Sequence, residues 1–112
     1  MVKLLVLFRA GAHSPQYDEG YNDFLMKLER LPGLLRKTIN TVYAGPGGRM
    51  PFGAVVEACF ESRAALEAAL TSPAGVEAGQ TLLNFAGPDA VILFADVMEE
   101  SFDSHDAASP QG

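Results

Sequence analysis

Three aromatic residues near the start of the chain are spaced as on one face of a helix and are the first candidates for chemistry. Tyr17, Tyr21 and Phe24 stand at i, i+4 and i+7, positions from which helical side chains project in the same direction. Such a stripe can line a pocket for a small hydrophobic or aromatic molecule, with the two hydroxyls orienting it. The same stripe is also typical of a helix packed on an ordinary core, so both interpretations stay open.

Two charged or titratable residues precede this stripe and are candidates for moving protons. Arg9 follows the first apolar run and could hold an acidic group or an enolate of a ligand. His13 could act as a general base, because the reference pKa of histidine is about 6.5. Tyr21 is the third catalytic candidate, although a phenol with a pKa of about 10 is a poor base at neutral pH. The alternatives are a solvated strand-end charge, a loop histidine and a core tyrosine.

Other reactive residue types lack the spacing that metal or nucleophile chemistry needs. The second histidine, His105, lies in an acidic C-terminal stretch, and Cys59 is the only cysteine. We therefore predict no metal site, no cofactor and no intrachain disulfide, and we expect Cys59 to be a buried core or interface residue. The glycine-rich residues 45–49 are not followed by Lys and Ser or Thr, so they predict a hairpin tip rather than a phosphate-binding loop.

The elements that must position these residues alternate between strands and helices. Short apolar or alternating segments predict strands at 2–10, 34–44, 52–60 and 90–97. Serine caps predict a helix from Pro15 to the Leu31-Pro32-Gly33 stop, a second at 63–70, and a restart at Ser72-Pro73 that runs to about Phe85. The order β-α-β-β-α-β predicts an α+β, ferredoxin-like fold with a four-stranded antiparallel sheet, strands one and three central and the helices on one face. Tyr43 and Phe60, on the second and third strands, complete the candidate ligand-binding set.

The first and last predicted strands are apolar on both of their alternating faces. Whichever face the helices leave open, it would expose Leu5 or Leu4 together with alternate residues between Val91 and Phe94. An apolar patch of this kind is rare on a soluble monomer. We therefore predict that two copies pack sheet to sheet as a symmetric homodimer.

Length and charge exclude several other classes of protein. The 112 residues fit one domain, which we place at 1–98, followed by an acidic tail at 99–112 that we predict to be disordered. The net charge of -6 argues against nucleic acid and against an anionic membrane surface as partners. Residues 1–63 hold all 8 Lys and Arg with 6 acids, whereas residues 64–112 hold 8 acids alone. The chain shows neither a signal-peptide pattern nor a membrane-length apolar run, so we predict a cytoplasmic location.

Three stretches together resemble the EthD family, named for ethyl tert-butyl ether degradation, in the dimeric α+β barrel superfamily. They are MVKLLVLFR at 1–9, LERLPGLLR at 28–36 and FESRAALEAALTSPAG at 60–75, and the resemblance spans residues 1–98. It implies dimerisation through the sheets and a cavity between sheet and helices for small hydrophobic or aromatic molecules. Relatives in the superfamily include cofactor-free monooxygenases, polyketide cyclases and lactone isomerases.

One departure from this resemblance affects the predicted chemistry. Many EthD-like proteins carry a histidine on the first helix, seven residues before the leucine of the LPG motif, and this chain has Phe24 there. The leading hypothesis is a homodimer that binds a small hydrophobic molecule, with any catalysis being a cofactor-independent oxidation, isomerisation or cyclisation. The alternatives are a non-catalytic binding or accessory protein of a degradation or biosynthetic pathway, and a dimer whose cavity is filled by side chains.

Overall fold

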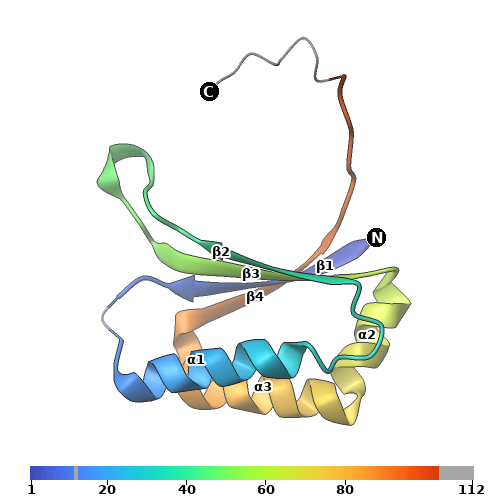
Figure 1. The fold of residues 1–112 in the computed structure, drawn as a ribbon, viewed down its shortest axis with the longest axis horizontal. Coiled ribbons are helices and arrows are strands. Elements are labelled where there is room, and N and C mark those ends of the chain that lie inside the picture. The colour runs from blue at the N-terminus through green and yellow to red at the C-terminus, as the bar shows by residue number, and fades with distance from the viewer. Residues whose placement is uncertain (12, 104–112) are drawn as a thin grey trace.

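A sheet of four antiparallel strands forms one layer of the protein and three helices form the other (Figure 1). The computed structural model describes residues 1–11 and 13–103. The strands are β1 (Val2–Arg9), β2 (Arg36–Thr41), β3 (Phe52–Phe60) and β4 (Ala90–Asp96), in the order β2-β3-β1-β4. Strands one and three are therefore central, and the predicted ferredoxin-like architecture is confirmed.

All three helices begin at the serine caps that the sequence predicts. They are α1 (Pro15–Leu28), α2 (Arg63–Thr71) and α3 (Pro73–Phe85). The hydroxyl oxygens of Ser14, Ser62 and Ser72 each accept a hydrogen bond from a backbone N–H three residues later, at 3.1 Å. These caps satisfy amide groups that the first turn leaves without helical partners. Short 3-10 turns at Pro46–Gly48 and Gly87–Asp89 precede β3 and β4.

Three predicted element boundaries are wrong by two or three residues: two lie beside the LPG motif, and the third is the end of β2, at Thr41 rather than at 44. Helix α1 ends at Leu28 rather than at Leu31, because the next three amides bond to carbonyls three residues back and tighten the chain into a turn. Strand β2 is shorter than 34–44, because the amide of Leu34 donates to the carbonyl of Leu31 within this turn. Gly33 allows the turn, with a φ of 81° that other residues rarely adopt.

Alternate residues of the central strands form the core against the helices. The side chains of Leu4, Val6 and Phe8 on β1 are buried, as are Val56, Ala58 and Phe60 on β3. The helices cover this face only, which confirms their predicted placement (Figure 1). The opposite face, called the open face below, carries Leu5, Leu7, Val91 and Leu93 from β1 and β4.

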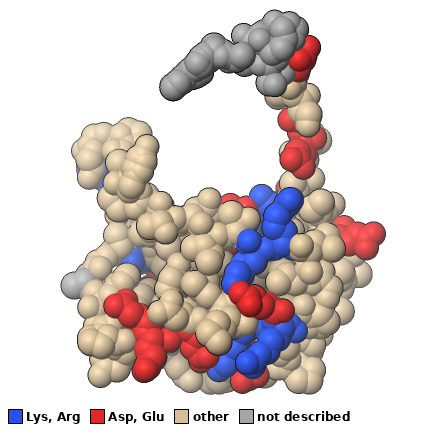
Figure 2. Space-filling view, viewed as in Figure 1, with Lys and Arg blue, Asp and Glu red and all other residues tan. Residues whose placement is uncertain are grey.

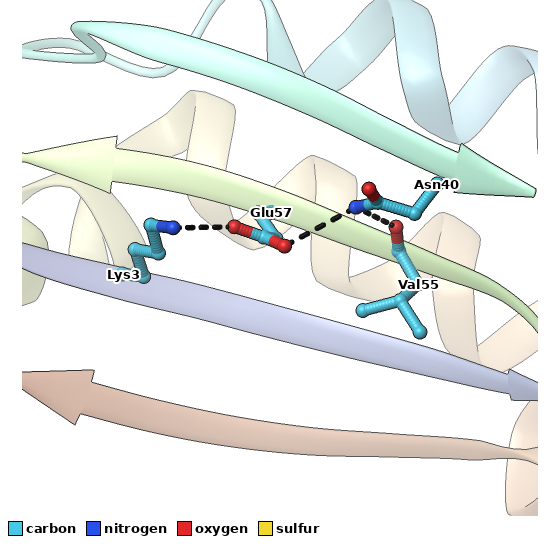
Figure 3. Close-up of polar contacts among 4 residues, drawn as sticks. All are labelled: Lys3, Asn40, Val55 and Glu57. Atoms are coloured by element: carbon cyan, nitrogen blue, oxygen red, sulfur yellow. Dashed lines mark hydrogen bonds and ion pairs between the residues drawn. The ribbon is translucent and has the colours of Figure 1, made fainter. Parts of the chain in front are cut away.

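The open face is apolar only toward β4, because polar side chains cross it toward β2. The ammonium Nζ of Lys3 lies 2.6 Å from Oε1 of Glu57, and the Asn40 amide donates to Oε2 of Glu57 at 3.2 Å (Figure 3). Asn40 also donates to the carbonyl of Val55 at 3.0 Å. The apolar part of the open face is thus formed by β1 and β4, the two strands for which the sequence predicts it. Cys59, on the same face, is buried as expected.

Beyond Asp96 the chain leaves the sheet, and residues 97–103 form neither helix nor strand. His105 and most of the predicted disordered tail lie outside the described residues, so the 98/99 domain boundary stays a prediction. Within residues 1–11 and 13–103, no helix has the length and apolar character needed to span a membrane.

Candidate functional site

A small apolar cavity lies between the sheet and helices α1 and α3. Its volume is about 160 Å³. The walls come from β1, β4 and all three helices, and include Leu4, Val6, Phe24, Leu28, Leu82 and Phe94. None of the described residues that line it has a polar or ionisable side chain. Recognition in this cavity therefore rests on shape and apolar contact.

Small residues on α3 create this space. Gly75, Ala78 and Gly79 line the cavity, and none of them has a side chain larger than a methyl group. A Cβ built on Gly79 would meet no atom within 4 Å. The cavity reaches the surface beside β4, where Phe94 lines it and is nevertheless 62% exposed. Gly75 and Gly79 were not among the predicted site residues; their spacing of four, which places both on one side of a helix, was the available signal.

The predicted aromatic stripe joins a larger cluster at the end of the cavity. The ring of Phe8 lies 5.1 Å from that of Tyr21 and 6.1 Å from that of Phe24, both edge-on. Phe85, which the sequence reading missed, stacks on Phe8 at 5.9 Å and meets Tyr17 edge-on at 5.1 Å. Phe24 is the residue common to both features, because it lines the cavity and packs in the cluster.

The two tyrosines of the cluster are held in their protonated form. Burial is the main cause that raises the pKa of Tyr17, and the charge of Asp89 adds to it. Burial alone raises the pKa of Tyr21 above its ordinary 10.0. The hydroxyl of Tyr17 is buried and has no hydrogen-bond partner among the described residues. At neutral pH these phenols can donate hydrogen bonds but cannot serve as bases.

Neither His13 nor Arg9 lines the cavity, and only His13 lies beside the cluster. The imidazole of His13 stacks on Tyr17 with ring centres 4.0 Å apart, and its Nδ1 is 3.6 Å from Oδ1 of Asp18. The guanidinium carbon of Arg9 lies 5.6 Å from the ring centre of Phe52, on β3. The structure therefore brings His13 and Tyr17 together but leaves Arg9 apart from them.

The last two candidate ligand residues lie away from the cavity. Tyr43, in the loop after β2, is 86% exposed, and Phe60 is 0% exposed within the core. Neither contributes to the cavity wall. A larger groove of about 580 Å³ lies between α2 and β4, with the Arg63–Asp96 ion pair in its wall, and it is more open to solvent than the cavity. Within the described ranges, no three His, Cys, Asp or Glu residues gather as metal ligands.

Comparison with known proteins gives structural relatives alone: no protein-family model and no curated protein matches the chain. A solved structure of an EthD family protein from Bacillus halodurans C-125 is 25% identical. The match covers 88% of this chain and 99% of that one, with a TM-score of 0.79. The predicted resemblance to the EthD family is thereby confirmed.

Two more distant structures share the fold. One is a dimeric ferredoxin-like protein of unknown function from Jannaschia sp. CCS1, at 17% identity, 86% and 98% coverage and a TM-score of 0.69. The other is SnoaB, a cofactor-independent oxygenase from Streptomyces nogalater, at 14% identity, 88% and 94% coverage and a TM-score of 0.63. A protein of unknown function and an oxygenase thus share one architecture. The fold alone does not indicate a reaction, so the function of this chain has to be inferred from its own site.

Proposed function

We propose that the protein binds a small hydrophobic or aromatic molecule in the cavity between its sheet and helices α1 and α3. The observation that carries the proposal is a volume of about 160 Å³ lined by apolar residues alone. A cavity of about 150 Å³ lined by Leu, Ile and Phe stays dry and binds benzene. The cavity therefore suits one ring, or a compact branched molecule such as ethyl tert-butyl ether.

The composition of the wall favours binding without catalysis, as in an accessory protein of a degradation or biosynthetic pathway. General acid–base catalysis needs a titratable group within hydrogen-bond reach of the reacting atom. Phe24, buried in the wall, occupies the position where many EthD-like proteins have histidine. Among the described residues, a molecule bound in the cavity would therefore contact apolar side chains and no titratable group.

A second candidate function is a cofactor-independent oxygenase, isomerase or cyclase. It is supported by the buried hydroxyl of Tyr17, which has no partner among the described residues. The ring of Tyr17 stacks on His13, and both lie next to the aromatic cluster, which includes Phe24 of the cavity wall. SnoaB has the same fold and is a cofactor-independent oxygenase. In this case Tyr17 and Tyr21 would donate hydrogen bonds to the substrate and His13 would move the proton. Turnover of a bound substrate separates this candidate from the first.

We further propose that two copies associate through their open faces. Leu5, Leu7 and Leu93 lie there without cover from the chain's own helices, and Leu93 is exposed. The polar side chains beside them are already paired, since Lys3 and Asn40 both bind Glu57. Burying that network would leave these groups satisfied. The Jannaschia protein of the same fold is described as dimeric.

The cytoplasm is the proposed location, because a lone buried cysteine fits a reducing compartment.

Toluene and ethyl tert-butyl ether are the probes for the cavity. Titration calorimetry and thermal unfolding are measured for the parent protein and for Ala78→Leu, which places three more carbons against the cavity. Ala68→Leu, on the exposed side of α2, is the matched control. We expect at least one probe to bind the parent and the control with an equimolar stoichiometry and to raise their Tm, and Ala78→Leu to lose the effect. Binding of neither probe, or equal binding by Ala78→Leu, would contradict the proposal.

A further inference from the structure

Residues 97–103, called the C-terminal arm below, extend away from the sheet on its open side. Figure 1 shows the arm rising from the end of β4, opposite to the helices. Its last backbone hydrogen bond to the sheet runs from the amide of Val97 to the carbonyl of Met1, at 2.9 Å. Two large apolar side chains follow, with Met98 85% and Phe102 80% exposed. An extended segment that carries such side chains buries little of them against its own fold.

The arm is acidic, and an unpaired cation lies at the far edge of the sheet. Glu99 and Glu100 follow Met98, and Figure 2 shows acidic side chains along the arm where it leaves the body. Arg36 opens β2 and is exposed, and no acid of the described ranges forms an ion pair with it. Within one copy these opposite charges belong to opposite edges, because β2 and β4 are the outer strands.

The register of the sheet shows how a second copy would bring them together. Arg36 pairs with Cys59, Cys59 with Lys3, and Lys3 with Ala95, so these residues form one row from edge to edge. Consider a face-to-face dimer whose two-fold axis is parallel to the strands. The rotation places β2 of one copy over β4 of the other, and each row keeps its position along the strand direction. Aligned packing of this kind is common for stacked sheets. The partner subunit's Arg36 then lies over Ala95, two residues before the arm begins.

We propose that the arm of each copy packs on a second copy of this chain, an inference that rests on the proposed homodimer. Glu99 or Glu100 pairs with the partner subunit's Arg36, while Met98 and Phe102 cover apolar side chains of the open face. The same contact occurs twice, because the two-fold axis repeats it. The acidic C-terminal half of the sequence thus serves to recognise the basic N-terminal half of another copy.

The test measures the dimer dissociation constant of the full-length chain by sedimentation velocity. The double variant Met98→Ser with Phe102→Ser is compared with the double variant Met26→Ser with Leu83→Ser, which alters similarly exposed side chains on α1 and α3. We expect the arm variant to weaken the dimer at least tenfold and the control to leave it within twofold. Thermal unfolding of both variants confirms that each is folded.

Charge reversal tests the pairing itself. The variant with Glu99→Lys and Glu100→Lys, and the single variant Arg36→Glu, should each weaken the dimer, and their combination should restore it at low salt. A stable dimer that neither arm variant weakens would overturn the arm contact and leave the homodimer standing. A parent protein that stays monomeric at every concentration would overturn the homodimer as well. Toluene binding, measured separately, is affected by neither result.

Discussion

Gly20 of α1 lies directly against Phe85 of α3, so close that a Cβ on the glycine would overlap the Cβ and ring of the phenylalanine. The two helices can approach only because Gly20 has no side chain. This approach brings Phe85 to Phe8 and Tyr17 and so closes the aromatic cluster beside the cavity. Gly20, in the helical layer, therefore determines where the ring of Phe85 packs against Phe8 of the sheet.

Gly20→Ala should destabilise the protein, contrary to the usual effect of such a change within a helix. Alanine normally stabilises a helix interior by about 1 kcal/mol relative to glycine. At this position the new methyl group must push Phe85 away, and overpacking of this kind costs about 1–3 kcal/mol. Gly79→Ala is the control, because its Cβ meets no atom within 4 Å, and it should stabilise the protein by about 0.5–1 kcal/mol. Urea unfolding measures both; equal effects of the two changes would show that Gly20 is not a close contact.

Tyr17→Phe should leave the protein as stable or make it more stable by about 1 kcal/mol. The hydroxyl that this change removes is buried without a partner among the described residues, and such a group costs about 1–3 kcal/mol. Tyr43→Phe removes an exposed hydroxyl and should alter stability by less than about 0.5 kcal/mol. Denaturant unfolding compares the variants with the parent. A clear loss of stability for Tyr17→Phe would mean that the hydroxyl is bonded in solution.

Stability should fall at alkaline pH as the half-buried phenols of Tyr17 and Tyr21 ionise. The pKa values of Tyr17 and Tyr21 are raised in the folded protein, so the folded state holds these protons more tightly than the unfolded state. The resulting stabilisation is complete below the unfolded value of about 10 and is lost as pH rises through the folded values. Phenolate absorbance during a pH titration should show two groups that ionise later in folded protein than in urea. Tyr17→Phe and Tyr21→Phe should each remove one of them; ionisation at the unfolded pH would refute the burial.

Phe24→His should produce a protein whose stability depends on acid. This position is buried in apolar surroundings, which disfavour the charged imidazole and lower its pKa below about 6.5. Because the folded pKa is the lower one, the histidine variant keeps its stability above about pH 6.5 and loses it as pH falls toward the folded value. Unfolding at pH 7.5 and at pH 5.5 measures the difference, with the exposed Tyr43→His as control. If both variants respond alike to pH, the Phe24 site is open to water.

The order of elements and the helix starts were determined by the sequence, because both depend on neighbours along the chain. The hydroxyls of Ser14, Ser62 and Ser72 act within one helical turn, so the residues that follow them suffice to predict each start. Alternation along β1 and β3 likewise reveals which residues point to one face. The stripe of Tyr17, Tyr21 and Phe24 was predicted for the same reason, and these rings do lie together.

The cavity, the cluster and the polar crossing of the open face were decided only by tertiary structure. Whether Gly79 leaves a space depends on how far α3 stands from the sheet, and that distance is set by other contacts such as Gly20 against Phe85. Phe85 meets Phe8 across 77 positions of the chain, and no local pattern contains that distance. Lys3, Asn40 and Glu57 come from three strands, and the register alone brings them side by side (Figure 3). Spacing along the chain reports the direction of a side chain, whereas an empty volume or a long-range pair depends on the distance between elements.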